Sequence, residues 1–297
     1  MLSRCMARTI SIVGAGRVGR TLGKRLRELG WRIGAVVTRS PATARAACYT
    51  IGGGSPHARL TRDVLDADII LVTTPDSALT AVSTALARIG GKECRGKVVL
   101  HTSGALDRTV LAPLGRCGAA TGSLHPMQTF SGRSLPKLKG VIFAVEGDPR
   151  ARRAAQEIAR QLGGVPVTIK SASKPAYHAA AVLVAGHALG LVEAATQLLM
   201  RAGFSRRRAT AALLPLMRQM LDNFERLGPQ AAWTGPVARG DFAVVAKHAK
   251  ALVKYPREFR EIYAALSLLA GRVLSKNPAA TIQHLKRALQ KSGGGPI

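Results

Sequence analysis

The feature that most restricts the fold is GAGRVG at residues 14–19, between an apolar strand-like run and a helical stretch. In that context Gly14 permits a tight turn, Gly16 lets the backbone approach a pyrophosphate, and Gly19 lets helix and strand pack closely. The start of the following helix offers free N–H groups to a phosphate. The alternative is a glycine-rich turn without a ligand. We predict a dinucleotide-binding turn formed by Gly14, Ala15, Gly16, Arg17, Val18 and Gly19.

The first half of the chain alternates short apolar runs with helical stretches, which is the order that builds a parallel sheet from βαβ units. Strands are expected at residues 8–13, 33–37, 68–73, 97–101, 119–124, 141–145 and 165–169. After residue 170 only helical patterns follow, at residues 171–203, 205–227, 241–253, 257–274 and 278–291. The sequence therefore predicts an α/β fold: a Rossmann-type, mostly parallel sheet over residues 1–170, followed by an all-helical C-terminal domain over residues 171–297.

Composition indicates a soluble protein that is large enough for two domains. The chain has 297 residues, of which 47% are hydrophobic and 20% charged. It contains no run of about 18 uninterrupted apolar residues, so we predict no membrane span. Its cysteines are scattered without a CxxC or a metal-ligand spacing, which predicts free thiols, a cytoplasmic location and no metal site. The four are Cys5, Cys48, Cys94 and Cys117.

A formal net charge of +28 raises the question of nucleic-acid binding. The basic residues are spread along the whole chain, the longest run is Arg206–Arg208, and aromatic residues for base stacking make up only 4%. This distribution is typical of a solvated surface. We expect no nucleic-acid partner and a positive field that favours a small anionic substrate.

The segment after the second predicted strand indicates which dinucleotide is bound. An NAD-specific site usually has an acidic residue there for the ribose 2′-hydroxyl, but this chain has Thr38, Arg39 and Ser40. A cation and two hydroxyl groups suit a 2′-phosphate, which predicts NADP as the cofactor; the alternative is that Arg39 is one more solvated arginine. Thr74 and Pro75 follow the next strand along the chain, and we expect Thr74 to line the nicotinamide ribose.

Two later strand ends carry polar groups suited to a reacting substrate, HTSG at residues 101–104 and SLHP at residues 123–126. Pro126 favours an extended conformation at His125, so Ser123 and His125 should point to the same side. An imidazole with a pKa near about 6.5 could donate a proton at physiological pH. We predict catalytic or substrate-binding roles for Ser103 and His125, with a polar turn residue as the alternative for His125.

The helical half adds candidates of its own. Lys174 and His178 are four residues apart and share a helix face, whereas His187 is out of phase with His178 and is expected on a packing face. His178 is therefore the rival of His125. Asp241 follows a polar loop and could hold the substrate or cap the next helix.

Taken together, GAGRVG, TPDS, HTSG, SLHPMQTF, YHAAA and TGPVARGD resemble the bacterial Rossmann-like oxidoreductases with a helical C-terminal domain of unknown function. These belong to the 6-phosphogluconate dehydrogenase-like superfamily. The resemblance spans almost the whole chain, and SLHPMQTF and TGPVARGD are its most specific parts. The superfamily includes ketopantoate reductase, pyrroline-5-carboxylate reductase, prephenate dehydrogenase and deazaflavin-dependent NADP reductase, so the fold does not fix the substrate.

The resemblance also implies roles for single residues. Prephenate dehydrogenases carry a similar His-Pro-Met stretch whose histidine hydrogen-bonds the reacting hydroxyl, which implies the same task for His125. Hydroxy-acid dehydrogenases of the superfamily place a catalytic lysine in the first interdomain helix, where this chain presents Tyr177 and His178, and the asparagine expected near Gly186 is replaced. A likeness to ketopantoate-type reductases implies a small branched 2-oxo acid as substrate.

Two classes of function remain open. The first is an NADPH-dependent oxidoreductase that reduces a small anionic carbonyl or imine compound at a cleft between the two domains. The second is a non-catalytic NADP-binding sensor or partner protein. The apolar faces of the first long helix, AAAVLVA and LGLVEAA, further predict a homodimer.

Overall fold

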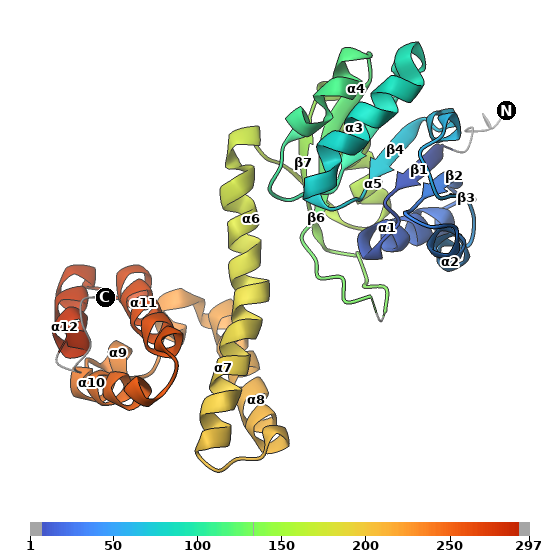
Figure 1. Ribbon diagram of the computed structural model, residues 1–297. Coiled ribbons are helices and arrows are strands. Elements are labelled where there is room, and N and C mark those ends of the chain that lie inside the picture. The colour runs from blue at the N-terminus through green and yellow to red at the C-terminus, as the bar shows by residue number, and fades with distance from the viewer. Residues whose placement is uncertain (1–7, 133, 291–297) are drawn as a thin grey trace. The chain divides into compact units, whose positions relative to one another are not determined.

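The computed structural model describes residues 8–132 and 134–290, and these form two compact units that divide between Ala185 and Gly186 (Figure 1). The predicted boundary near Lys170 lies earlier in the chain. The first unit extends further because the helix that follows Lys170 begins with Lys174, whose side chain is buried in that unit.

The first unit is built on one eight-stranded sheet with the order β3-β2-β1-β4-β5-β6-β7-β8. Every neighbouring pair is parallel except β6 and β7, so the sheet is mostly parallel, as predicted. The strands are β1 Thr9–Val13, β2 Arg32–Val37, β3 Ser55–His57, β4 Ile69–Val72, β5 Val98–His101, β6 Ala120–Pro126, β7 Ile142–Gly147 and β8 Val165–Thr168.

All seven predicted strands are present, and two details differ. The short strand β3 was not predicted because its sequence, SPH, has neither an apolar run nor β-branched residues. Strand β6 continues through His125 to Pro126, since His125 pairs with Ala144 of the antiparallel neighbour β7. The histidine that was expected just after this strand is therefore part of it.

Helices cover both faces of the sheet because the strand residues alternate between two apolar clusters. Ile10 and Ile12 of β1 pack with Leu22 and Leu26 from the helix after the glycine turn, whereas Ile70 of β4 belongs to the cluster on the other face. Burying each such side chain contributes about 1.5–3 kcal/mol. The helices of this unit are α1 Arg17–Glu28, α2 Pro41–Ile51, α3 Asp76–Gly90, α4 Ala112–Arg116, α5 Pro149–Gln161 and α6 Lys174–Val182.

The second unit is helical throughout its described residues. A π-helical turn, Leu183–His187, crosses the boundary between the units, and His187 is exposed, so it does not lie on a packing face within one chain. The unit consists of α7 Ala188–Arg201, α8 Arg206–Ala232 with a kink at Gly228, α9 Pro236–Arg239, α10 Phe242–Ala251, α11 Arg257–Leu274 and α12 Pro278–Gln290.

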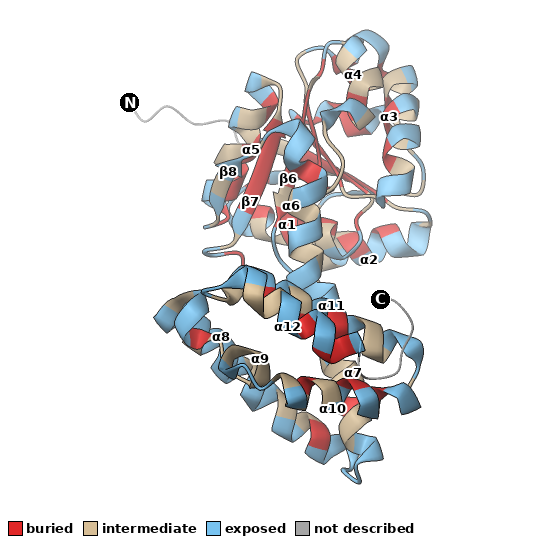
Figure 2. Ribbon diagram, turned by 90° about the vertical axis from the view of Figure 1, so that its left-hand side faces the viewer, coloured by how far each residue is buried: buried red, intermediate tan, exposed pale blue. Residues whose placement is uncertain are grey.

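The core of the second unit is small. Its buried cluster consists of five residues from α10, α11 and α12: Val245, Ala249, Ala264, Leu285 and Leu289. Along α7 and α8 only Thr196, Ala209 and Ala232 are buried, and Figure 2 shows both helices mostly exposed or half-buried, in contrast to strands β6 and β7. Large apolar side chains on these two helices therefore remain uncovered within one chain.

One helical segment, Ser171–Arg201, is long and apolar enough to cross a membrane by length and composition alone. Its most apolar window has a mean hydropathy of 1.6, and only 6% of that window is buried inside the chain. The buried residue Lys174 at its start belongs to the first unit. The exposed apolar surface requires an explanation, either as a membrane contact or as an interface with another protein.

Candidate functional site

The glycine-rich turn has the geometry that the sequence predicts. Gly14 has a φ of +85°, and a side-chain carbon added there would lie 2.7 Å from the backbone nitrogen of Thr74. A carbon added at Gly19 would lie 2.4 Å from Thr73 Oγ1, so this glycine permits the close packing of α1 on the sheet. At Gly16 the nearest atom would be 3.7 Å away, which leaves its backbone open to a ligand.

A cavity of about 1270 Å³ runs from this turn along the carboxyl ends of the strands. The wall contains several of the predicted cofactor residues, namely Gly14, Ala15, Gly16, Val18, Thr38, Arg39, Ser40, Thr74 and Pro75. Arg17 instead lines a separate cavity of about 300 Å³, and its guanidinium donates to the carbonyl of Phe130 at 3.5 Å. Ligands of open α/β sheets bind at the carboxyl ends of the strands, so the position of the larger cavity fits a dinucleotide.

The end of the cavity beyond β2 contains three hydroxyl groups that bond to one another. Thr38 Oγ1 lies 2.7 Å from Thr43 Oγ1, and Ser40 Oγ lies 2.9 Å from the same atom. Ser40 also caps α2 by accepting from the backbone N–H of Thr43. Arg39, in contrast, has no hydrogen-bond or ion-pair partner among the described residues. The unpaired cation is thus the group most available to an anionic ligand.

The TPDS segment forms the start of α3, with Pro75 in the N-cap position. Thr74 Oγ1 is buried and has no hydrogen-bond partner among the described residues, although Thr74 lines the cavity. A buried hydroxyl without a partner is unfavourable unless a ligand or water satisfies it. This orphaned atom fits the predicted contact with a bound ribose.

His125, Tyr177 and His178 form a cluster at the end of β6. His125 Nδ1 lies 2.8 Å from the Tyr177 hydroxyl, and the His125 and His178 rings meet edge to face with centroids 5.7 Å apart. Both imidazoles lie against Gly104, because a side-chain carbon there would be 2.8 Å from His125 Nε2 and 2.4 Å from His178 Cδ2. The structure therefore brings the two rival histidines together.

The pKa of His125 differs from the expected one. Burial, followed by the positive charge of Lys174 and then by His178, lowers the pKa of His125 to about 4. The sequence-based value near 6.5 is wrong because it assumes a solvated imidazole. His125 is neutral at pH 7, and burial raises the pKa of Tyr177 to about 12, so its hydroxyl keeps its proton.

Ser103 is buried, and its hydroxyl is already fully engaged. It donates to Asp76 Oδ2 at 2.8 Å and accepts from the backbone N–H groups of Ala105 and Leu106. Ser103 thus fixes the turn after β5 and joins it to the start of α3. No hydroxyl proton is left for a substrate in this arrangement.

Lys174 is the polar residue that the sequence analysis undervalued. Its side chain is fully buried, and its ammonium group donates to the Ser103 carbonyl at 2.9 Å and to Ser123 Oγ at 2.8 Å. Burial lowers the pKa of Lys174 to about 8, while Glu146, Asp107 and Asp76 oppose that shift. Ser123 and His125 both contact α6, as the alternation along the strand predicts.

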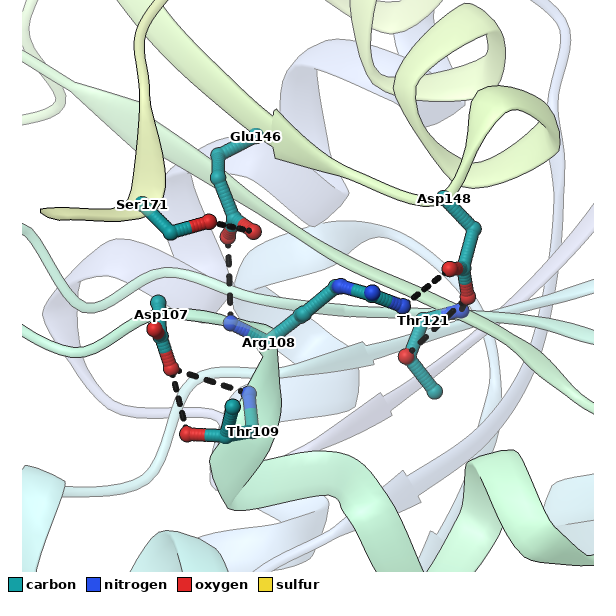
Figure 3. Close-up of polar contacts among 7 residues, drawn as sticks. All are labelled: Asp107, Arg108, Thr109, Thr121, Glu146, Asp148 and Ser171. Atoms are coloured by element: carbon teal, nitrogen blue, oxygen red, sulfur yellow. Dashed lines mark hydrogen bonds and ion pairs between the residues drawn. The ribbon is translucent and has the colours of Figure 1, made fainter.

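Glu146 at the end of β7 is a second buried charge that the sequence analysis missed (Figure 3). Its carboxylate accepts from Ser171 Oγ at 2.9 Å and from the backbone N–H of Arg108 at 3.0 Å. It also accepts from Ser123 Oγ at 3.5 Å, a residue that the figure does not draw. It therefore joins the start of α6 to the sheet and balances Lys174 through Ser123. No local pattern identifies Glu146, because its partners are 23–38 residues away.

Asp241 lies in the second unit. It occupies the N-cap position of α10, but its carboxylate makes no capping hydrogen bond and pairs with Arg239 Nε at 2.9 Å. Within its own unit the side chain is thus engaged by a neighbouring cation. Among the described residues, no group of three or more His, Cys, Asp or Glu could hold a metal ion.

Comparisons with known protein families agree with this architecture. Residues 4–126 match the family model of a Rossmann-like domain, and residues 141–270 match that of a domain of unknown function, DUF2520. Together the two models match most of the chain, the Rossmann-like segment first and the DUF2520 segment second. The resemblance to Rossmann-like proteins with a helical C-terminal domain of unknown function is confirmed.

Solved structures share the fold across nearly the whole length of this chain. A Bacteroides fragilis protein named as a candidate NADP oxidoreductase has 23% identity and a TM-score of 0.68, covering 93% of this chain and 98% of its own. A reductive aminase from Aspergillus terreus, solved with NADPH and ethyl-5-oxohexanoate, has 17% identity, a TM-score of 0.61 and coverages of 98% and 97%. A pyrroline-5-carboxylate reductase from Coxiella burnetii has 15% identity, a TM-score of 0.55 and coverages of 94% and 97%. A comparison with curated proteins found no match.

Proposed function

We propose that this protein is an NADPH-dependent reductase of a small anionic carbonyl or imine compound. The observation that carries the proposal is the cavity at the carboxyl edge of the sheet, which joins the glycine turn to the HTSG segment through Thr102 and Ser103. Gly14 and Gly16 would receive the pyrophosphate, Arg39 the 2′-phosphate, and Thr74 Oγ1 a ribose hydroxyl. NADPH, when bound, supplies a hydride to an electrophilic carbon.

The side chains around His125 support proton transfer to the substrate from a neutral imidazole. Because His125 is neutral and Tyr177 keeps its proton, the Tyr177 hydroxyl can donate to His125 Nδ1, which leaves the other ring proton on Nε2. We infer that Nε2–H donates to the substrate oxygen or nitrogen. As the Nε2 proton moves to the substrate, the Tyr177 proton moves to Nδ1; a proton from solvent then restores Nε2–H while the Nδ1 proton returns to the tyrosinate.

The other predicted residues support this pair. Ser103 fixes the turn that carries Gly104, against which both imidazoles pack. Burial, together with the positive charge of Lys174, keeps His125 neutral, and the charge of Lys174 is balanced by Glu146. We infer that His178 fixes the orientation of the His125 ring or contacts the substrate. A role for Asp241 in holding the substrate remains part of the proposal.

The substrate class follows from charge and from the neighbours. A net charge of +28 favours an anionic substrate. The similar structures include a reductase named for a cyclic imine carboxylate and a reductive aminase, which supports imines beside the ketopantoate-like 2-oxo acids that the sequence suggests. We therefore propose small 2-oxo acids and cyclic imino acids as the first compounds to test.

The test is NADPH oxidation, followed at 340 nm, over a panel of small 2-oxo acids and cyclic imines. The proposal expects turnover of at least one anionic member and a lower rate with its uncharged ester. A protein that binds NADPH but turns over no member of the panel would instead be the non-catalytic NADP-binding protein. A protein that binds no nicotinamide cofactor would refute the proposed function.

We also propose that the protein is a homodimer. Leu183, Val184 and Leu189 are 57%, 77% and 70% exposed, and Phe224 on α8 is 54% exposed. A second copy could cover these side chains, and obligate dimers bury about 2,000 Å² or more of mostly apolar surface. Lys174 anchors the start of the same helical segment in the first unit, which favours a protein partner over a membrane. Sedimentation of the detergent-free protein should show a dimer at micromolar concentration; a monomer, or a protein soluble only in detergent, would contradict this.

A cytoplasmic location belongs to the same proposal. Cys48, Cys94 and Cys117 are free thiols, which suits a reducing compartment, and Cys5 lies outside the described residues.

A further inference from the structure

The outer end of the cavity contains a second arginine, Arg59, which the sequence analysis did not single out. Arg59 is exposed and lines the cavity together with Arg39, Ala58 and Leu60. Neither Arg39 nor Arg59 has a hydrogen-bond or ion-pair partner among the described residues. Two cations without a bonded partner therefore border the same space, and Asp76, which also lines it, accepts from Ser103 Oγ.

The register of the sheet explains why they lie together. Strands β2 and β3 are parallel, with Val37 opposite His57, and the backbone N–H of Thr38 donates to the His57 carbonyl at 3.0 Å. Arg39 and Arg59 each stand two residues beyond that pair. Adjacent strands are about 4.8 Å apart, so the two arginines leave neighbouring strands at equivalent positions.

The surroundings do not neutralise this charge. Asp63 lies close by in the sequence, but its carboxylate is 3.5 Å from His57 Nε2. Arg62, three residues after Arg59, pairs with Glu93 at 3.3 Å and does not line the cavity. An arginine of the same segment thus has an acidic partner, whereas Arg39 and Arg59 do not. A dianionic ligand would neutralise both.

We propose that Arg59 is a specificity-determining residue for NADPH and binds the 2′-phosphate together with Arg39. This inference rests on the proposed function, since it assigns a ligand group to the same cavity. A phosphate monoester carries a charge of about −1.5 to −2 at pH 7 and three acceptor oxygens. Two planar guanidinium groups can share these oxygens, each through paired N–H donors.

The test measures binding of NADPH, NADH and 2′-AMP to the full-length protein by isothermal titration, in wild type and in single variants. Arg59→Ala should weaken NADPH and 2′-AMP about tenfold or more and change NADH affinity less than about twofold. Arg59→Lys keeps the positive charge but loses the paired N–H donors of the guanidinium, so it should give an intermediate loss of NADPH affinity. Arg62→Ala removes a positive charge from the same segment and should change none of the three affinities.

The outcomes separate this inference from the proposed function. Equal losses for NADPH and NADH in Arg59→Ala would show a contact with the adenine or ribose and would overturn the 2′-phosphate role. Unchanged NADPH affinity in Arg59→Ala would overturn any role of Arg59 but leave the reductase proposal intact. A wild-type protein that binds neither dinucleotide would refute the proposed function itself. Equal losses of NADPH affinity in Arg59→Ala and Arg62→Ala would show that only the overall surface charge matters, which would also overturn the inference.

Discussion

Replacing Ser123 by Ala tests the buried polar network under the candidate site with a minimal change. The substitution removes one oxygen atom, which accepts from Lys174 Nζ at 2.8 Å and lies 3.5 Å from Glu146 Oε2. Lys174 then keeps a single hydrogen bond, to the Ser103 carbonyl. Because both side chains are fully buried, water cannot replace the lost acceptor without a rearrangement.

The size of the effect follows from the charge on Lys174. Leaving a buried charged donor without its acceptor costs about 1–3 kcal/mol. A chain segment of the length of the first unit loses about 2–4 °C in Tm per kcal/mol, so the melting temperature should fall by about 2–12 °C at pH 6.5.

The effect should depend on pH, with a sign fixed by Lys174. Burial lowers the pKa of Lys174 to about 8 in the folded protein, against 10.5 ordinarily. Between these values the unfolded state binds more protons, so the stability of the wild type rises with pH across that window. Losing Ser123 Oγ disfavours the protonated form further and shifts the start of this rise below pH 8. The difference between variant and wild type should therefore be largest below about pH 7 and shrink toward about 1 kcal/mol above pH 8, where only a neutral hydrogen bond is lost.

The assay is urea unfolding at pH 6.5 and pH 9, followed by the fluorescence of Trp31 in a Trp233→Phe background. Trp31 is buried in the first unit, so its emission reports that unit alone. Ser11→Ala is the matched control, because Ser11 is equally buried on β1 but accepts only from the neutral N–H of Ala35. Its loss should be the same at both pH values. A loss in Ser123→Ala that is equally independent of pH would refute the assignment of a buried, charged Lys174.

Three further substitutions test the cofactor cavity and the Tyr177–His125 pair. Arg39→Ala should weaken NADPH binding about tenfold or more and leave NADH binding nearly unchanged; equal losses for both cofactors would remove Arg39 from the 2′-phosphate site. Gly14→Ala should abolish measurable dinucleotide binding, because the added carbon would meet the Thr74 backbone at 2.7 Å at a φ of +85°; a variant that binds normally would contradict the turn geometry. Tyr177→Phe should lower kcat about tenfold or more and keep NADPH affinity, and a normal kcat would exclude the Tyr177–His125 proton path.

The sequence predicts the cofactor end of the site well because its determinants are local. The three glycines act through the backbone of a single turn, and Thr74 and Pro75 follow from the end of one strand and the start of one helix. Apart from the short α9, which was expected to be a loop, the helices after residue 170 are also predicted within a few residues, since apolar spacing and the Gly and Pro residues between them mark their ends.

The substrate end is predicted less well because it depends on contacts across the fold. Lys174 reaches Ser103 and Ser123 over 71 and 51 residues, and its burial cannot be deduced from a helix that otherwise presents alanines to solvent. The pKa of His125 follows from the same burial and from Lys174, which explains why an ordinary value was expected. Register identifies Arg59 only after β3 is known, and the residues of β3 give no strand signal.

The central claim is tested most directly by kcat and NADPH affinity in wild type, His125→Asn and His178→Asn, using the best substrate of the NADPH-oxidation panel. In His125→Asn the introduced amide can still bond Tyr177 in place of Nδ1 but has no atom at the position of Nε2, so the substitution removes the proposed donor alone. We predict that His125→Asn lowers kcat on the order of 100-fold or more, keeps the fold and leaves NADPH affinity unchanged, with a smaller loss of kcat in His178→Asn. A His125→Asn protein with wild-type turnover would contradict the account, and a selective loss in His178→Asn would move the proton donor to that residue.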